Sequence, residues 1–258
     1  MRYALDVQYR GKSYSGSQIQ FENGEPIKEP TIQGELERAI STLIISGKNT
    51  AENNNRPVKT IFSGRTDKGV NALGQVVHFD IDKEIVASSF IYHINEILPS
   101  DISVNNLRIV PPSWHAQKSA VARYYRYELI NRHYKQAFDD DILRVKYDLD
   151  VERMQSALNF LLGEHDFSSF KSSGTLNPSK ICTITEANVE KQGDRIFIHI
   201  VGNRFLYNMV RTIVGTLLEI EGHKLPTEHM KDVLEACDRR KAGQTVSPYG
   251  LTLMKVIY

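Results

Sequence analysis

Arg65 and Asp67 stand on either side of a threonine in the stretch 62–80, FSGRTDKGVNALGQVVHFD, with a glycine shortly before and after them. A guanidinium can hold a neighbouring carboxylate ionised and fix its direction. An ionised, oriented carboxylate suits nucleophilic or acid–base chemistry. The alternative is a surface turn with a local ion pair, because Asp-Lys-Gly is also a turn signal. Alone, this pair does not distinguish a catalytic carboxylate from a turn residue.

A second candidate is the stretch 122–129, ARYYRYEL, in which aromatic and cationic side chains alternate. Successive side chains of a strand point to opposite faces. If this stretch is a strand, one face carries Arg123, Tyr125 and Tyr127. The other face carries Tyr124, Arg126 and Glu128. Such a surface can stack bases and contact phosphates. The alternative is a half-buried edge strand whose tyrosines pack in the core.

Arg211 is the third candidate, because it lies within FLYNMVRTIVG among strongly apolar neighbours. The apolar spacing predicts a buried helical stripe through Phe205, Met209, Ile213 and Leu217. A charge in that setting either reaches out to water or is buried and paired. If it is paired, Asp67 is the obvious carboxylate partner.

The composition and the absence of several motifs exclude some classes of protein and of functional site. The 258 residues include 32 Lys plus Arg against 31 Asp plus Glu, so affinity for nucleic acid would need a local basic face. The two cysteines lie far apart, and no histidine has metal-ligand spacing, which argues against a disulfide framework and a zinc site. Phosphate-binding and dinucleotide-binding glycine motifs are absent from the sequence. With no signal-peptide core and no membrane-length apolar run, the sequence predicts a cytoplasmic protein.

Hydrophobic periodicity predicts an α+β fold in two halves, residues 1–110 and 111–258. In the first half we expect strands at 2–9, near 58–62, at 74–81 and at 101–110, and helices at 31–44 and 88–98. This β-α-β-β-α-β order is the split βαβ arrangement of ferredoxin-like folds. In the second half we expect a strand at 121–130, a hairpin over 183–202, helices at 151–162, 203–220 and 227–237, and a last strand at 251–258. The polar stretch 47–57 predicts a loop.

At this point the sequence resembles a known family. SGRTDKGVNALGQVVHFD is similar to the signature of the TruA-type tRNA pseudouridine synthases, whose usual form is GRTDAGVHA followed by Q-V-x-x-F. The similarity extends over nearly the whole chain, in order through YRGKSYSGSQIQ, TIQGELERAI, NEILPSDISV, SWHAQKSAVARYYRYEL, LLGEHDFSSF, NRFLYNMVRTIVGTLLE and VSPYGLTLMKV. Many ordered motifs in one chain are more specific than any one of them.

The resemblance implies an enzyme that isomerises uridine to pseudouridine in tRNA, at positions 38–40 of the anticodon stem-loop. It implies two α+β halves whose sheets join across a central RNA-binding catalytic cleft, with no cofactor, no metal and a homodimeric state. By position, Asp67 matches the catalytic aspartate, which attacks the ribose or the base or abstracts a ribose proton. Arg65 matches the arginine that assists base flipping, Tyr125 the tyrosine that stacks on the flipped uracil, and Arg211 the arginine that pairs with the carboxylate.

The same reading assigns RNA contacts to seven further residues, namely Arg10, Lys12, Gln18, Lys68, Arg123, Arg126 and Arg204. Three residues depart from the family pattern: Ser17 stands for a tryptophan, Lys68 for an alanine and Asn71 for a histidine. These departures leave open a different tRNA position or another structured RNA as substrate. A further alternative is a non-catalytic tRNA-binding or chaperone protein, although binding alone would not need a carboxylate among phosphates.

Overall fold

The computed structural model describes residues 1–22, 24–45, 58–139, 141–172 and 179–258, which form two compact units. The first unit contains Met1–Val121 and Leu253–Tyr258, and the second contains Ala122–Thr252. The predicted loop over 47–57 lies outside the described residues.

The division between the units differs from the expected one after residue 110, because the chain up to Val121 is bonded to the first unit. Arg2 Nη1 donates to the carbonyl oxygens of Pro112 at 2.6 Å and Trp114 at 2.7 Å. The N–H of Val121 donates to the carbonyl of Ile257 at 2.8 Å. These bonds hold both the linking segment and the last strand against the first unit.

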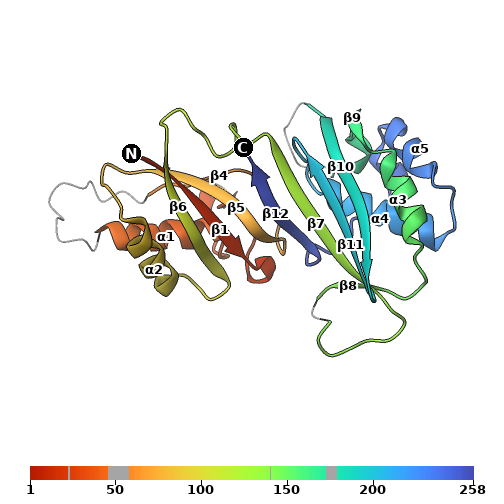
Figure 1. Ribbon diagram of the computed structural model, residues 1–258, viewed down its shortest axis with the longest axis horizontal. Coiled ribbons are helices and arrows are strands. Elements are labelled where there is room, and N and C mark those ends of the chain that lie inside the picture. Colours follow the sequence, from red (N-terminus) through yellow and green to blue (C-terminus); the bar gives the residue numbers. More distant parts are fainter. Residues whose placement is uncertain (23, 46–57, 140, 173–178) are drawn as a thin grey trace. The chain divides into compact units, whose positions relative to one another are not determined.

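The first unit is a mostly antiparallel sheet with two long helices (Figure 1). Its elements are β1 (Arg2–Tyr9), β2 (Phe21–Glu22), β3 (Glu25–Pro26), α1 (Ile32–Ile45), β4 (Ile61–Phe62), β5 (Asn71–Asp80), α2 (Ala87–Ile97), β6 (Ile102–Val110) and, from Leu253 on, β12 (Leu251–Ile257). The strand order is β6-β1-β5-β12, with β4 beside β5. Before β12 the elements longer than three residues run β1, α1, β5, α2, β6, and the strand predicted near 58–62 is present only as the two-residue β4.

Strand β1 forms the centre of this sheet because its alternating apolar residues face inward. The predicted face is buried throughout: Tyr3, Leu5, Val7 and Tyr9. Leu5 lies opposite Val77 of β5 and Leu107 of β6. Figure 1 shows α1 and α2 next to each other along these strands. The sheet therefore fixes the ends of β1 and β5, from which the Asp67 loop is held.

The second unit is also a mostly antiparallel sheet packed with helices. Its elements are β7 (Ala122–Asn131), β8 (Leu143–Val145), α3 (Val151–Asn159), β9 (Gly163–Asp166), β10 (Ile181–Gln192), β11 (Arg195–Gly202), α4 (Met209–Gly222) and α5 (His229–Ala236). The strand order is β7-β11-β10-β9, and β8 runs parallel beside β7. The hairpin predicted over 183–202 is formed by β10 and β11, which pair up to Gln192 and Arg195 on either side of the turn. None of the helices in the described residues combines the length and apolar composition that a bilayer crossing requires.

The helix predicted over 203–220 was wrong in its first six residues, since α4 begins at Met209. Asn208 has φ 62°, a left-handed conformation that interrupts a right-handed helix. Asn203 is instead bonded to β10: its N–H donates to the carbonyl of Thr183 at 3.0 Å, and its Oδ1 accepts from the Thr183 N–H at 2.9 Å. Tertiary hydrogen bonds therefore outweigh helical periodicity in this segment.

Candidate functional site

The Asp67 loop, which we define as residues 63–70, connects β4 to β5 in the first unit. Its side chains alternate in exposure: Arg65 is exposed, Thr66 is buried and Asp67 is half-buried. The N–H of Val70 donates to the carbonyl of Asp67 at 3.1 Å and closes a turn. The loop therefore anchors itself through Thr66 and directs its two charged neighbours outward.

Thr66 is held from the sheet by Tyr9 at the end of β1. The two hydroxyl oxygens lie 2.8 Å apart, and Gln75 Nε2 donates to the Tyr9 Oη at 3.3 Å. Because the Tyr9 oxygen accepts from Gln75, its one proton is available for Thr66. Burial raises the pKa of Tyr9 to about 12, which keeps that proton in place at neutral pH. A fully buried tyrosine thus fixes the threonine that precedes Asp67.

Gln75 also ties the start of the loop to β5. Its Nε2 donates to the carbonyl of Gly64 at 3.0 Å, and its Oε1 accepts from the hydroxyl of Ser63 at 2.6 Å. The N–H of Ser63 donates to the carbonyl of Val76 at 2.8 Å. Gln75 and Ser63 are fully buried, so water does not compete for these bonds.

The other side of the loop touches the short 3-10 helix Gly11–Ser13. A Cβ on Gly11 would lie 2.1 Å from the carbonyl oxygen of Val70, so only glycine permits this approach. Asn71 Oδ1 accepts from the Gly11 N–H at 2.9 Å. This contact places Arg10 and Lys12, the neighbours of Gly11, on a segment adjoining the loop.

Four of the predicted RNA-facing cations are therefore brought together by two touching segments of the first unit. Arg10, Lys12, Arg65 and Lys68 are all exposed. Positive side chains on adjacent segments can contact the phosphates of a nucleic-acid backbone. Gln18 differs from them, because it is half-buried.

In the second unit Tyr125 is buried on β7, with 8% of its surface exposed. Its ring meets that of Phe205 edge to face, with centroids 5.1 Å apart and planes at 79°. Arg123, two residues earlier on the same face, donates through Nη1 to the carbonyl of Asn203 at 2.8 Å. Arg123 and Tyr125 therefore both meet the 203–205 segment, which also carries the half-buried Arg204.

Arg211 is held through its guanidinium on the first turn of α4. Its Nε donates to the carbonyl of Val246 at 2.8 Å, and its Nη1 donates to Asn208 Oδ1 at 2.6 Å. Tyr127 Oη donates to the carbonyl of the next residue, Ser247, at 2.9 Å. Burial raises the pKa of Tyr127, and the positive charge of Arg211 acts in the opposite direction. Arg211 is thus half-buried and oriented by planar hydrogen bonding.

Arg126 does not join Tyr125, because alternation along β7 turns it to the other face. Its guanidinium carbon lies 5.0 Å from the ring centre of Phe197, a cation–π distance. On the same face Tyr124 Oη is 2.6 Å from His199 Nδ1. The two predicted faces of this strand are therefore real, and both tyrosines of the Tyr125 face, Tyr125 and Tyr127, are buried.

Sequence reasoning missed the residues that orient the site. Tyr9 and Gln75 act through hydrogen bonds to positions far along the chain, and only their polar character within apolar strands could have drawn attention to them. Asn208 gave one usable signal, since asparagine is among the residues that most tolerate left-handed backbone.

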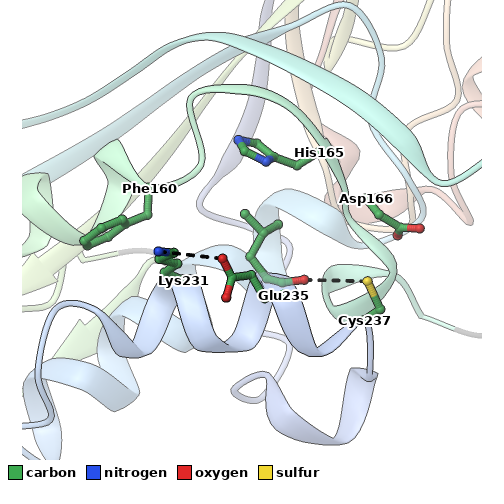
Figure 2. Close-up of a pocket in the computed structure, with 7 residues that line it drawn as sticks. Phe160, His165, Asp166, Lys231, Glu235 and Cys237 are labelled. Atoms are coloured by element: carbon green, nitrogen blue, oxygen red, sulfur yellow. Dashed lines mark hydrogen bonds and ion pairs between the residues drawn. The ribbon is translucent and has the colours of Figure 1, made fainter.

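A pocket of about 300 Å³ lies elsewhere in the second unit, among α3, β9 and α5 (Figure 2). Seven residues line it: Phe160, His165, Asp166, Lys231, Leu234, Glu235 and Cys237. Lys231 pairs with Glu235, and the Cys237 thiol and His165 Nε2 bond to backbone carbonyls. None of the predicted site residues lies in its lining. Within the described ranges, no three His, Cys, Asp or Glu side chains gather closely enough to hold a metal ion.

Comparison with known proteins supplies the family. A family model described as tRNA pseudouridine synthase matches residues 157–258. A tRNA pseudouridine synthase A from Brevibacillus brevis is 39% identical over 252 residues, which cover 97% of this chain and 96% of the relative. One from Pseudomonas aeruginosa is 41% identical over 258 residues (100% and 85%). Another, from a Thermoanaerobacter species, is 40% identical over 253 residues (98% and 97%). The similarity therefore includes both units.

Proposed function

The chain belongs to the tRNA pseudouridine synthase A family and so is an isomerase of tRNA uridines, and we propose that its targets are positions 38–40 of the anticodon stem-loop. The observation that carries this proposal is the Asp67 loop. Its backbone is fixed by buried hydrogen bonds, and the exposed cations Arg65 and Lys68 stand before and after Asp67 in the loop. A carboxylate held among phosphate-binding groups suits chemistry on RNA better than binding alone.

The reaction needs a carboxylate and a held base. The C1′–N1 glycosidic bond of uridine breaks, the uracil turns, and a C1′–C5 bond forms. The C5 proton passes to solvent, and N1 gains a proton, so atoms and electrons balance without an oxidant or reductant. We propose that Asp67 supplies the carboxylate that acts on the ribose or base of the target nucleotide, and that Arg211 pairs with it to fix its direction.

A uridine within a stem must leave the base stack before this chemistry, at a cost of a few kcal/mol. We propose that Arg65, exposed beside Asp67, assists this flipping, and that Tyr125 stacks on the flipped uracil. Stacking on an aromatic ring returns about 1–3 kcal/mol per base. The edge contact with Phe205 supports this role because it fixes the plane of the Tyr125 ring before RNA binds.

The remaining contacts are electrostatic. We propose that Arg10, Lys12, Lys68, Arg123, Arg126 and Arg204 contact phosphates and that Gln18 contacts RNA through its amide. The family resemblance further supports two split βαβ halves around a central RNA-binding cleft and a cytoplasmic homodimer.

The test is to map pseudouridine in a tRNA transcript after incubation with the protein. The substrate carries uridine at positions 38, 39 and 40, and the matched control carries cytidine there with all other uridines kept. We expect pseudouridine at one or more of these three positions and none in the control. Pseudouridine at other positions, with 38–40 unmodified, would contradict the proposed target and favour a different tRNA site.

A further inference from the structure

Ser17 is a fully buried polar residue that bonds to the Asp67 loop from the side opposite Tyr9. Its backbone N–H donates to the carbonyl of Thr66 at 3.0 Å, and its Oγ accepts from the Thr66 N–H at 2.8 Å. The Oγ also lies 3.4 Å from the same carbonyl, to which it donates weakly. The peptide groups on both sides of Thr66 are therefore held by one residue, and the second of them leads into Asp67.

The backbone beside Ser17 lies directly against this part of the loop. Gly16 has φ 106°, which side-chain-bearing residues rarely adopt, and a Cβ there would be 3.1 Å from the Thr66 carbonyl oxygen. The carbonyl of Ser17 accepts from the N–H of Gln33 at 2.9 Å, in the first turn of α1. Ser17 thus connects the loop to a helix whose apolar face is packed in the core.

Thr66 is consequently held on two sides by independent elements. Ser17, whose carbonyl is bonded to the first turn of α1, holds the peptide groups of Thr66, and Tyr9 on β1 holds its side chain. The planar Thr66–Asp67 peptide is bonded directly to the Cα of Asp67, so its orientation limits the directions that the carboxylate can take. Loss of either contact leaves Asp67 on a loop with more orientations to sample.

We propose that Ser17 is a positioning residue for Asp67, acting through Thr66 to set the direction of the catalytic carboxylate. This inference rests on the proposed role of Asp67 in isomerisation. A positioning role predicts an effect on turnover and little effect on RNA binding, because Ser17 is buried and does not reach the RNA. A misplacement near 1 Å at a reacting group costs up to about 100-fold in rate.

The test compares Ser17→Ala with Ser15→Ala, a buried serine two residues earlier whose N–H bonds to Pro30 and not to the loop. Tritium release from tRNA labelled at uridine C5 gives kcat and KM. Thermal unfolding and amide hydrogen exchange at Thr66 report folding and the loop. We expect Ser17→Ala to lower kcat about 10- to 100-fold with KM within about twofold, and to speed Thr66 exchange. We expect Ser15→Ala to keep kcat and the Thr66 exchange rate close to those of the parent protein.

A second variant separates positioning from folding. Tyr9→Phe removes the other hydrogen bond to Thr66, and combining it with Ser17→Ala gives a double-mutant cycle. We expect the combined loss in kcat to differ from the product of the single losses, since both residues act on Thr66. A Ser17→Ala kcat within about twofold of the parent, or a loss confined to KM, would overturn the inference. A parent protein that releases no tritium would instead contradict the isomerisation itself.

Discussion

The chain around Asp67 is fixed through its backbone, whereas Arg211 is fixed through its own side chain. In the first unit, buried groups of Tyr9, Ser17 and Gln75 bond to Thr66 and Gly64 and hold the backbone that leads to Asp67. In the second unit the guanidinium donates directly to Val246 and Asn208.

The difference teaches where each site is sensitive to substitution. In the proposed roles, changing Asp67 should remove chemistry and keep the bonds that Tyr9, Ser17 and Gln75 make to the loop. Changing Arg211 should remove chemistry and also take this donor from the carbonyl of Val246. Activity and stability should therefore separate in the first unit and fall together in the second.

We expect the largest loss of activity among these tests on substituting Arg211, which also tests whether activity and stability fall together in the second unit. Arg211→Lys keeps the charge and loses the planar fork that reaches two acceptors at once. We predict a loss in kcat of about 100-fold or more, together with a fall of about 1–3 kcal/mol in the free energy of unfolding from two lost hydrogen bonds. Steady-state kinetics and urea denaturation check both. A variant that lost activity at unchanged stability would contradict the anchoring role.

Tyr125 comes next. Tyr125→Leu removes the ring and should lower kcat/KM about 10- to 100-fold, because stacking on the base is lost. Tyr125→Phe is the matched control, since it keeps the ring and the edge contact with Phe205 and should stay within about threefold. Equal losses in both variants would show that the hydroxyl, and not stacking, carries the role of Tyr125.

Substituting Asn208 tests how much of the orientation of Arg211 comes from its hydrogen bond to this residue. Asn208→Gly retains the left-handed backbone at no steric cost and removes the oxygen that accepts from Arg211. We predict a fall in kcat of about tenfold, from freer motion of the guanidinium. Kinetics on labelled tRNA measures the effect, and an unchanged kcat would mean that the bond to Asn208 is not needed to orient Arg211.

Features set by local periodicity could be predicted from the sequence, whereas features set by tertiary contacts could not. Alternation along β1 and β7 gave the correct faces, including the buried Tyr127, because local periodicity decides them. Helix 203–220 was misjudged because Asn208 and the bonds of Asn203 to Thr183 are set by tertiary contacts. The spacing of chemistry-bearing residues drew attention to Asp67 and Arg211.

The supporting contacts could not be found from the sequence. Ser17 contacts a residue far along the chain, and a serine in a Gly-Ser-Gln segment carries no signal of burial. Its 0% exposure arises from the packing of α1 and the Asp67 loop around it. Tyr9 was predicted on the apolar face of β1, and its hydroxyl partner was not predictable from that pattern.

Substituting the exposed cations of the first unit should weaken RNA binding and leave the turnover of bound tRNA unaltered. Lys12→Gln and Lys68→Gln are each expected to reduce the slope of log affinity against log salt by about 0.7–0.9. Lys83→Gln is the matched control, an exposed lysine of the same unit away from the loop. A slope unchanged in both test variants would argue that these lysines are only solvated turn residues.

A smaller effect concerns pH and the strand that follows the loop. Burial on β5, then the charge of Arg2, lowers the pKa of His78 to about 4, against about 6.5 in the unfolded chain. Between these values the unfolded chain binds more protons, so stability falls as pH drops from about 6.5 toward 4. We predict a loss of about 1–2 kcal/mol at pH 5 relative to pH 7, measured by urea denaturation. His78→Asn should flatten this dependence, and an equally steep one would assign the effect elsewhere.

The most direct test is tritium release from tRNA labelled at uridine C5, with the parent protein and Asp67→Asn side by side. Asp67→Asn keeps the size of the side chain, and the buried contacts of Thr66 do not involve it. We predict release by the parent, none above background by the variant, and the same unfolding midpoint for both. Release by Asp67→Asn at a rate near that of the parent would contradict the central claim that this carboxylate performs the isomerisation.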